Sequence, residues 1–190
     1  MTGGYDMRIA TILTVCAGIA LAGAGHSALA ETVTVKVPGT AMPWIIKKKN
    51  PDLPYGKADG TAPAVAPLKL TAGMSLQMTA TGSTTTVAGG GSFDPGGQAE
   101  FICDDHLGGS GMPFPSIYMS HGFYPVHLNE LVAIFTDGKG RRVKSPFPVG
   151  TGLTITVPEG AEAIQFGLND DIYADNSGEI DVTITPAAAQ

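Results

Sequence analysis

Apolar and polar side chains alternate along several short segments of the chain. In residues 32–37, valine occupies every second position, and threonine or lysine fills the positions between. This period of two is typical of a strand that turns one face to a core and the other to solvent. Alternation or a short apolar run predicts further strands at residues 68–70, 75–80, 99–103, 131–135, 153–157, 163–168 and 180–184.

Turn residues separate these segments, and no segment carries the 3.6-residue apolar stripe of an amphipathic helix. The chain has 26 Gly and 14 Pro among its 190 residues, and runs such as Asp137-Gly138-Lys139-Gly140 are turn chemistry. Short strands divided by turns predict an all-β fold, either an antiparallel β-sandwich or a jelly roll.

Two long stretches lack this alternation of apolar and polar residues. Residues 38–67 contain six prolines and a run of three lysines, which predicts an irregular arm over the domain surface. Residues 104–129 contain glycines, prolines, aromatic residues and three histidines, which predicts a long inserted loop. The histidine spacing matches no familiar zinc pattern.

The first 30 residues have the pattern of a secretory signal peptide. Arg8 precedes an apolar run at residues 9–23, and Ala28-Leu29-Ala30 resembles a cleavage site. The apolar run is shorter than the ~20 residues that cross a bilayer, so we expect no membrane span. The expected mature chain is one domain, residues 31–190, that is secreted or periplasmic.

Charge and cysteine content narrow the classes of partner. Eleven Lys and Arg against 17 Asp and Glu give a net charge of -6, which disfavours binding to nucleic acid phosphates. Without the leader, Cys103 is the one remaining cysteine, so no internal disulfide is expected. No motif for catalysis is evident, and we expect that the protein is not an enzyme.

One polar segment carries candidate chemistry. It reads Asn169-Asp170-Asp171-Ile172-Tyr173-Ala174-Asp175-Asn176-Ser177-Gly178, with three carboxylates, two amides and no Lys or Arg. Crowded carboxylates favour a hard divalent cation with oxygen ligands, and calcium is the leading candidate. The absence of Cys and His in the segment disfavours softer metals. The alternative is a solvated turn in which Asp and Asn bond their own backbone.

The C-terminal part of the chain resembles a known family. The run 163–170, which ends in Asn169-Asp170, and the later Asp175-Asn176-Ser177-Gly178 are similar to the end of the PA-IL-like bacterial galactose-binding lectins. Ala80-Thr81-Gly82 and Phe101-Ile102-Cys103 resemble two earlier family segments. In that family a calcium ion held by this loop binds sugar hydroxyls directly, so the resemblance implies a calcium-dependent lectin with a β-sandwich fold.

The resemblance also implies a set of calcium ligands. Asp170 would be the acidic ligand and Asp175 and Asn176 the later pair, with Asp171 as a substitute if the register shifts by one. Backbone carbonyls would come from near Thr86 and from one loop residue, which is Ile172, Tyr173 or Ala174. The loop is two residues shorter than the lectins' loop. Asp175 stands where they have Asn, and its extra charge should strengthen calcium binding.

The sugar side of the site is less well matched. The family places a His-Pro and a Gln beside the ion, whereas this chain has Asp94-Pro95-Gly96-Gly97-Gln98. Pro95 and Gln98 are the candidate sugar-binding residues, together with the ion ligands Asp170 and Asp175. Tyr118, Phe123 and Tyr124 either stack on a sugar ring or pack the inserted loop.

Two functions therefore compete at this stage. The first is an exported carbohydrate-binding module for galactose or another glycan, whose weak sites would gain strength in a homo-oligomer. The second is a structural or interaction module in which calcium only makes the loop rigid.

Overall fold

The computed structural model describes residues 1, 31–45, 59–102 and 126–187. Its elements are strands, in chain order: β1 (Val33–Pro38), β2 (Ala64–Val65), β3 (Ser75–Thr85), β4 (Ser92–Phe93), β5 (Gln98–Ile102), β6 (His127–Leu128), β7 (Leu131–Thr136), β8 (Phe147–Pro148), β9 (Gly152–Thr156), β10 (Ala163–Leu168) and β11 (Gly178–Ala187). All pairings between them are antiparallel.

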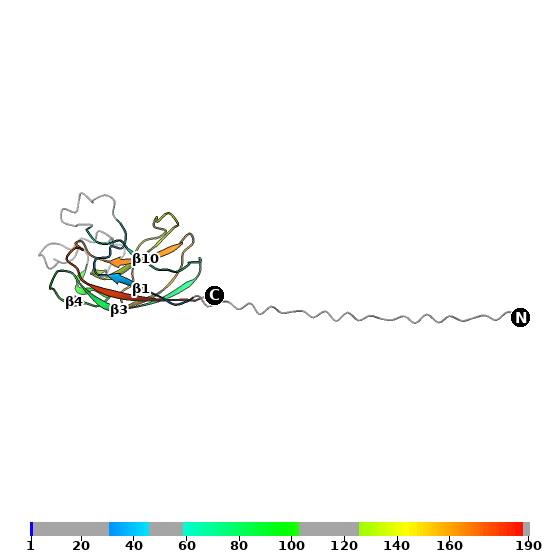
Figure 1. Ribbon diagram of the computed structural model, residues 1–190, viewed down its shortest axis with the longest axis horizontal. Coiled ribbons are helices and arrows are strands. Elements are labelled where there is room, and N and C mark those ends of the chain that lie inside the picture. The colour runs from blue at the N-terminus through cyan, green and yellow to red at the C-terminus, as the bar shows by residue number, and fades with distance from the viewer. Residues whose placement is uncertain (2–30, 46–58, 103–125, 188–190) are drawn as a thin grey trace.

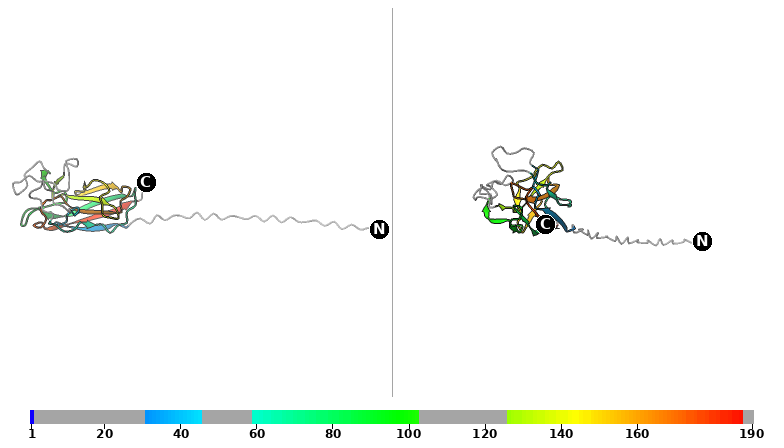
Figure 2. Two further views of the ribbon diagram at one scale, coloured as in Figure 1. Left: turned by 90° about the horizontal axis from the view of Figure 1, so that it is seen from above. Right: turned by 60° about the vertical axis from the view of Figure 1, so that its left-hand side comes forward.

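The strands form two main sheets that pack face to face. The larger sheet has the order β1-β11-β3-β4, and β9 pairs with β3 along the same edge as β4. The smaller sheet has the order β2-β10-β7-β8, and β5 and β6 form a separate pair. Figure 1 shows β10 above the layer that contains β1 and β3. In the left view of Figure 2 the strands of both layers run in nearly the same direction. The predicted all-β antiparallel sandwich is confirmed.

The core between the sheets follows from the sequence pattern. Leu76, Met78 and Ala80 alternate inward along β3, and Ile180, Val182 and Ile184 do the same along β11. All six residues of β7 are buried, so both faces of this strand are covered. A strand covered on both faces carries a continuous apolar run instead of an alternation. This explains why residues 131–135 form a continuous apolar run, whereas predicted strands such as 75–80 alternate apolar and polar residues.

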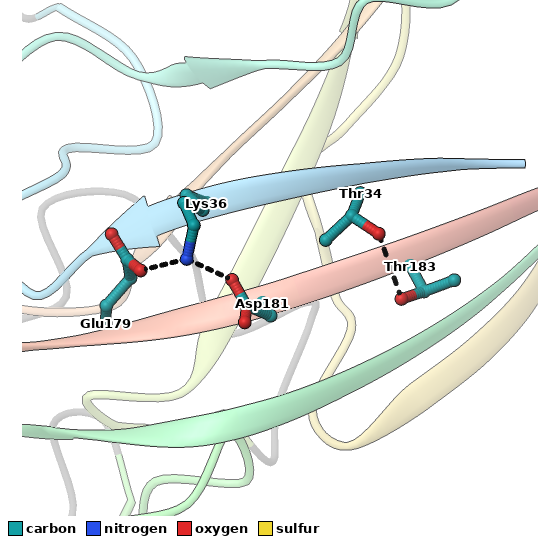
Figure 3. Close-up of polar contacts among 5 residues, drawn as sticks. All are labelled: Thr34, Lys36, Glu179, Asp181 and Thr183. Carbon is teal, nitrogen blue, oxygen red and sulfur yellow. Dashed lines mark hydrogen bonds and ion pairs between the residues drawn. The ribbon is translucent and has the colours of Figure 1, made fainter.

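The outer face of the larger sheet is polar. Lys36 on β1 reaches across to two carboxylates on β11, Glu179 at 2.5 Å and Asp181 at 3.0 Å. Thr34 and Thr183 are paired further along the same two strands at 3.4 Å, and Figure 3 shows both contacts. Such exposed ion pairs add little stability, so the register of β1 on β11 depends on the buried valines of β1.

Two segments differ from the simplest reading of the pattern. β3 runs to Thr85, beyond the predicted strand at residues 75–80, and Gly82, with a φ of 108°, pairs with Ile180 on β11. Residues 68–70 form no strand, although Leu70 is buried and Leu68 is half-buried. Their alternation reflects contact with the core without a neighbouring strand.

The described parts of segment 38–67 pack closely on the sandwich. Ala41 and Met42 are buried, and Leu168 N on β10 donates to Ala41 O at 2.9 Å. A Cβ on Gly167 would collide with the backbone of Met42 and Pro43. This part of the segment therefore crosses directly over the end of β10, next to the polar segment 169–177.

Several expectations lie outside the described residues. These are the leader at 2–30, the middle of the Pro-rich arm at 46–58, and the insertion from 103 to 125 with Tyr118, Phe123 and Tyr124. The last residues of the predicted insertion are described: β6 pairs with β5, and Val126 is fully buried. Across the described residues, no helix is long and apolar enough to cross a membrane.

Candidate metal centre

Residues 169–177 connect the end of β10 to the start of β11 at one end of the sandwich. Although the segment is polar, Asn169, Asp170 and Asn176 are at most 7% exposed. Tyr173 is fully buried beneath it, and its hydroxyl donates to Leu168 O at 2.7 Å and Asp170 O at 3.0 Å. The Tyr173 side chain thus fixes the backbone of the loop from beneath, and the polar side chains above it are shielded from solvent.

Asp170 is the centre of this loop. Its Oδ1 accepts hydrogen bonds from the backbone N–H groups of Asp171 at 2.7 Å and Ile172 at 3.4 Å, and its Oδ2 accepts from Asn176 at 2.8 Å. Burial, with a smaller contribution from the neighbouring charge of Asp171, nevertheless raises the pKa of Asp170 to about 8. Burial also raises the pKa of Asp171. Asp170 therefore keeps its proton near neutral pH, because its hydrogen bonds do not offset the cost of burying a negative charge there.

The side chain of Asn176 has a fixed orientation. Its Nδ2 donates both to Asp170 Oδ2 and to Gly39 O, at 3.1 Å, so exchanging nitrogen and oxygen would place two acceptors against the Asn176 oxygen. Asn176 Oδ1 must then point away from these two groups, and it is buried without a hydrogen-bond partner among the described residues. A buried amide oxygen without a partner costs about 1–3 kcal/mol.

The adjacent residue repeats this feature. Asp175 Oδ1 is also buried and has no hydrogen-bond partner in the described part of the chain. Two unpartnered oxygens from consecutive residues, beside a buried Asp170, form a donor set suited to a hard cation. No three His, Cys, Asp or Glu side chains of the described residues gather as a metal group. A cation here would therefore depend on the Asn176 amide and on backbone carbonyls besides the carboxylates.

Peptide geometry indicates which loop carbonyl is available. The backbone N–H groups of Tyr173 and Ala174 donate to Asp59 Oδ1, at 2.8 Å and 3.3 Å. In a planar trans peptide the carbonyl points opposite to the N–H group, so the carbonyl of Ile172 points away from Asp59. The carbonyl of Tyr173 already accepts from Asn176 N at 3.1 Å. Of the three carbonyls left open by the sequence, that of Tyr173 is therefore already bonded, and those of Ile172 and Ala174 remain as candidates.

Asp59 is a site residue that the sequence did not reveal. It lies 114 residues before Tyr173, within the segment expected to be an irregular arm. A Cβ added to the neighbouring Gly60 would collide with Thr40 O and lie only 2.8 Å from Tyr173 Cβ, so only glycine fits there. Gly39 is similarly close to the backbone of Ser177 and supplies the acceptor for Asn176. The glycines flanking these positions were the only local signal of such close approach.

Thr86 and Gln98 are brought together on the other side of the loop. Gln98 is 6% exposed, and its Nε2 donates to Thr86 Oγ1 at 2.7 Å. The preceding residue, Thr85, exchanges hydrogen bonds with Ser177: Thr85 N donates to Ser177 O, and Ser177 N donates to Thr85 Oγ1, both at 3.0 Å. Thr86 and Gln98 therefore lie beside the end of the loop, as the family resemblance implies.

Pro95 belongs to a turn that is held on the β6–β7 connection. Pro95 O accepts from Leu131 N at 2.9 Å, and His127 Nδ1 lies 3.0 Å from Gly96 O. Glu130, 8% exposed, accepts from His127 N at 2.8 Å, and burial raises the pKa of its carboxyl. Pro95 and Gln98 are both buried, so the ring of Pro95 contributes packing. Of the two candidate sugar contacts, Gln98 is the one bonded to a residue beside the loop, Thr86.

Asn129 joins this turn to the loop. It is fully buried with a φ of 61°, and its backbone N–H donates to Asn169 O at 2.7 Å. Its Nδ2 donates to Thr84 Oγ1 at 2.7 Å, and its Oδ1 has no partner among the described residues. Asn tolerates positive φ better than most residues, so Asn129 both shapes the backbone and ties β3 to the end of β10.

Comparison with known proteins gives a likeness in structure but not in sequence. No protein-family model matches the chain, and no curated protein sequence matches it. The chain is similar in structure to the EclA N-terminal domain, described as a PllA-like lectin, with 18% sequence identity over 84% of this chain and 98% of that chain, at a TM-score of 0.41. At this level the likeness carries no argument about the site, whose chemistry rests on the residues described above.

Proposed function

We propose that the protein is a calcium-dependent carbohydrate-binding module whose ion is held by the 169–177 loop. The ligands from side chains are Asp170, Asp175 and Asn176, and the carbonyls of Ile172 and of Thr86 complete the protein's share. Asp171 lies beside Asp170 and contributes charge. When bound, calcium would supply open coordination positions that two adjacent sugar hydroxyls can fill in place of water.

The observation that carries this proposal is the pair of buried, unpartnered oxygens on Asp175 and Asn176. In native proteins such atoms are rare and call for a specific explanation, for example an ion. A solvated turn would instead leave its Asp and Asn oxygens exposed or bonded to the loop's own backbone. The fixed orientation of Asn176 means that its oxygen cannot be satisfied by rotating the amide.

The chain's own groups prepare the site. Asp59 holds the backbone of residues 173–174, Gly39 orients Asn176, and Tyr173 supports the loop from below. Because these contacts are made by the chain's own groups, they would leave little ordering entropy to oppose binding. Gln98, bonded to Thr86, is the side chain that would contact a hydroxyl of the bound sugar.

The test is a calcium titration by calorimetry on the mature chain, residues 31–190, and on its Asp175→Ala variant. We expect saturable binding that the variant loses. A matched control is Asp137→Ala, which removes an Asp from the opposite end of the sandwich and should leave calcium binding unchanged. Retained calcium binding in Asp175→Ala, with its fold verified by circular dichroism, would contradict the proposed ligands.

A glycan array, probed with calcium and then with chelator, tests the carbohydrate part. Chelator-sensitive binding that Asp175→Ala also loses supports the module, with galactose and other sugars bearing vicinal hydroxyls as the first candidates. Saturable calcium binding without any chelator-sensitive glycan would favour the alternative function, in which the ion only makes the loop rigid. Export and assembly into a homo-oligomer belong to the same proposal and are tested by secretion of a tagged chain and by light scattering.

A further inference from the structure

A cavity lies at the open edge of the sandwich, away from the 169–177 loop. Its volume is about 590 Å³, within the usual range for small-molecule sites. It lies between edge strands of the two sheets, because Phe147 belongs to β8, and Ile155 and Thr156 belong to β9. The lining residues are Phe135, Lys144, Ser145, Pro146, Phe147, Ile155, Thr156 and Pro158.

The register of the strands separates this cavity from the proposed calcium site. Leu131 at the start of β7 pairs with Leu168, the last residue of β10 before the loop, whereas Phe135 pairs with Ile164 near the other end. On the larger sheet, Thr156 pairs with Ser75, at the end of β3 that lies away from Thr85 and the loop. A ligand in the cavity would therefore bind independently of the ion.

The walls of the cavity are apolar. Five of its eight lining residues are Phe, Ile or Pro, and the rings of Phe135 and Phe147 lie 5.5 Å apart at an interplanar angle of 35°. Hydrophobic walls of this kind suit an alkyl chain or an aromatic ring. A sugar would find few partners for its hydroxyls, since Ser145 and Thr156 supply the only uncharged polar side chains of the lining.

The single charged group of the lining is a cation. Lys144 is exposed, and no ion pair with a described residue involves it. It ends a basic turn of residues 137–146, in which four bases accompany one acid. Asp137, that acid, is already bound by Arg141 at 2.6 Å, and Arg142 lies over the Trp44 ring at 5.0 Å. In a chain of net charge -6 this concentration of positive charge favours an anionic head group.

We propose that this cavity binds a small amphipathic anion, an alkyl or aryl carboxylate, with its apolar body between Phe135, Phe147 and Ile155 and its carboxylate at Lys144. The proposal does not rest on the function of the 169–177 loop. It gives the module a second ligand class, which is recognised by apolar contact and one charge and not through a metal ion.

The test is calorimetric titration of the mature chain with decanoate and, separately, with decanol, in chelator and below the micelle concentration of decanoate. We expect saturable decanoate binding that exceeds decanol binding about fivefold, the size of one partly screened charge contact. Lys144→Gln should lower decanoate affinity about fivefold, to the level of decanol. Lys139→Gln, on the same turn but outside the cavity, should leave both affinities unchanged.

A second variant tests the apolar wall. Ile155→Asp places a carboxylate in the cavity and should abolish decanoate binding, with circular dichroism verifying that the fold persists. The proposal would be overturned by the absence of saturable binding to the wild-type chain, or by equal decanoate affinity in wild type and Lys144→Gln. Equal losses in Lys139→Gln and Lys144→Gln would also overturn it, because they would indicate unspecific attraction to the basic turn.

Discussion

Each end of the β7–β10 strand pair carries a connection that contains Asp: the 137–146 turn at one end and the 169–177 loop at the other. The surroundings of the two carboxyl groups, Asp137 and Asp170, shift their pKa values in opposite directions. In the 137–146 turn, Asp137 accepts from Lys139 N and Arg141 N, both at 2.9 Å, and from Arg141 Nε at 2.7 Å. These hydrogen bonds hold the pKa of Asp137 below its usual value. In the 169–177 loop, Asp170 has only amide donors, and burial raises its pKa. One carboxylate is satisfied by its own turn, whereas the other needs an outside positive charge.

This difference shows that residue type alone does not make a binding site. Asp and polar neighbours occur in both connections, but only the turn 137–146 contains bases. The 169–177 loop also crosses beneath segment 38–42, which buries it. A site for a cation arises where crowding of acids, burial and an absence of bases coincide.

The largest expected effect comes from removing the side-chain amide of Asn176. Asn176→Ala removes one unpartnered oxygen and also the donor to Asp170 Oδ2 and Gly39 O. We expect calcium affinity to fall at least 100-fold and the metal-free chain to lose about 2 kcal/mol of unfolding free energy. Calorimetry and urea denaturation measure the two effects. Asp137→Ala should leave calcium affinity at the wild-type value, and an equal fall in both variants would refute the contrast between the two ends.

The pH dependence of stability should reveal the raised pKa of Asp170. Asp170 has a pKa of about 8 in the folded chain, above its ordinary value, so the folded state binds more protons than the unfolded state between these values. Stability of the metal-free chain should therefore be greatest below about pH 4 and fall as the pH rises from about 4 to about 8, with on the order of 2 kcal/mol lost between about pH 5.5 and 7.5. Urea denaturation at these pH values measures the fall. Asp170→Asn should flatten the curve, and a curve unchanged by that substitution would contradict the assignment.

A smaller effect is expected from removing the Asp59 carboxylate, which holds the backbone of residues 173 and 174. Asp59→Ala removes the acceptor for Tyr173 N and Ala174 N, so the Ile172 carbonyl loses its fixed direction. Calcium affinity should fall about tenfold, the size typical of groups that orient metal ligands. Asp59→Asn keeps an acceptor oxygen and should recover most of the affinity. If both variants bind calcium as tightly as wild type, Asp59 has no positioning role.

The smallest effect on calcium should come from Gln98→Ala. This side chain bonds Thr86 Oγ1, whereas the proposed ligand is the Thr86 carbonyl, so calcium affinity should change less than about threefold. Affinity for the glycan found on the array should fall more than calcium affinity does, as measured by titration of that glycan in saturating calcium. A parallel fall of both affinities would indicate that Gln98 supports the ion and not the sugar.

Alternation in the sequence determined much of the fold. It placed β10 at residues 163–168 and the inward faces of β3 and β11, since a two-residue period with one buried face admits one register. The sequence also identified the polar segment 169–178, because it contains three acids and no Lys or Arg. The resemblance then indicated Thr86 and Gln98, which the structure brings into contact.

Only the tertiary structure decided what that segment can do. The sequence could not show that Asp59 and Gly39, more than 100 residues earlier in the chain, hold the loop, or that Asn176 is turned so that its oxygen has no partner. It also gave no sign that β8 and β9 leave an apolar cavity beside Lys144. Periodicity records which face of a strand is buried, whereas a site depends on which distant segments meet there and on which polar atoms that meeting leaves unpaired.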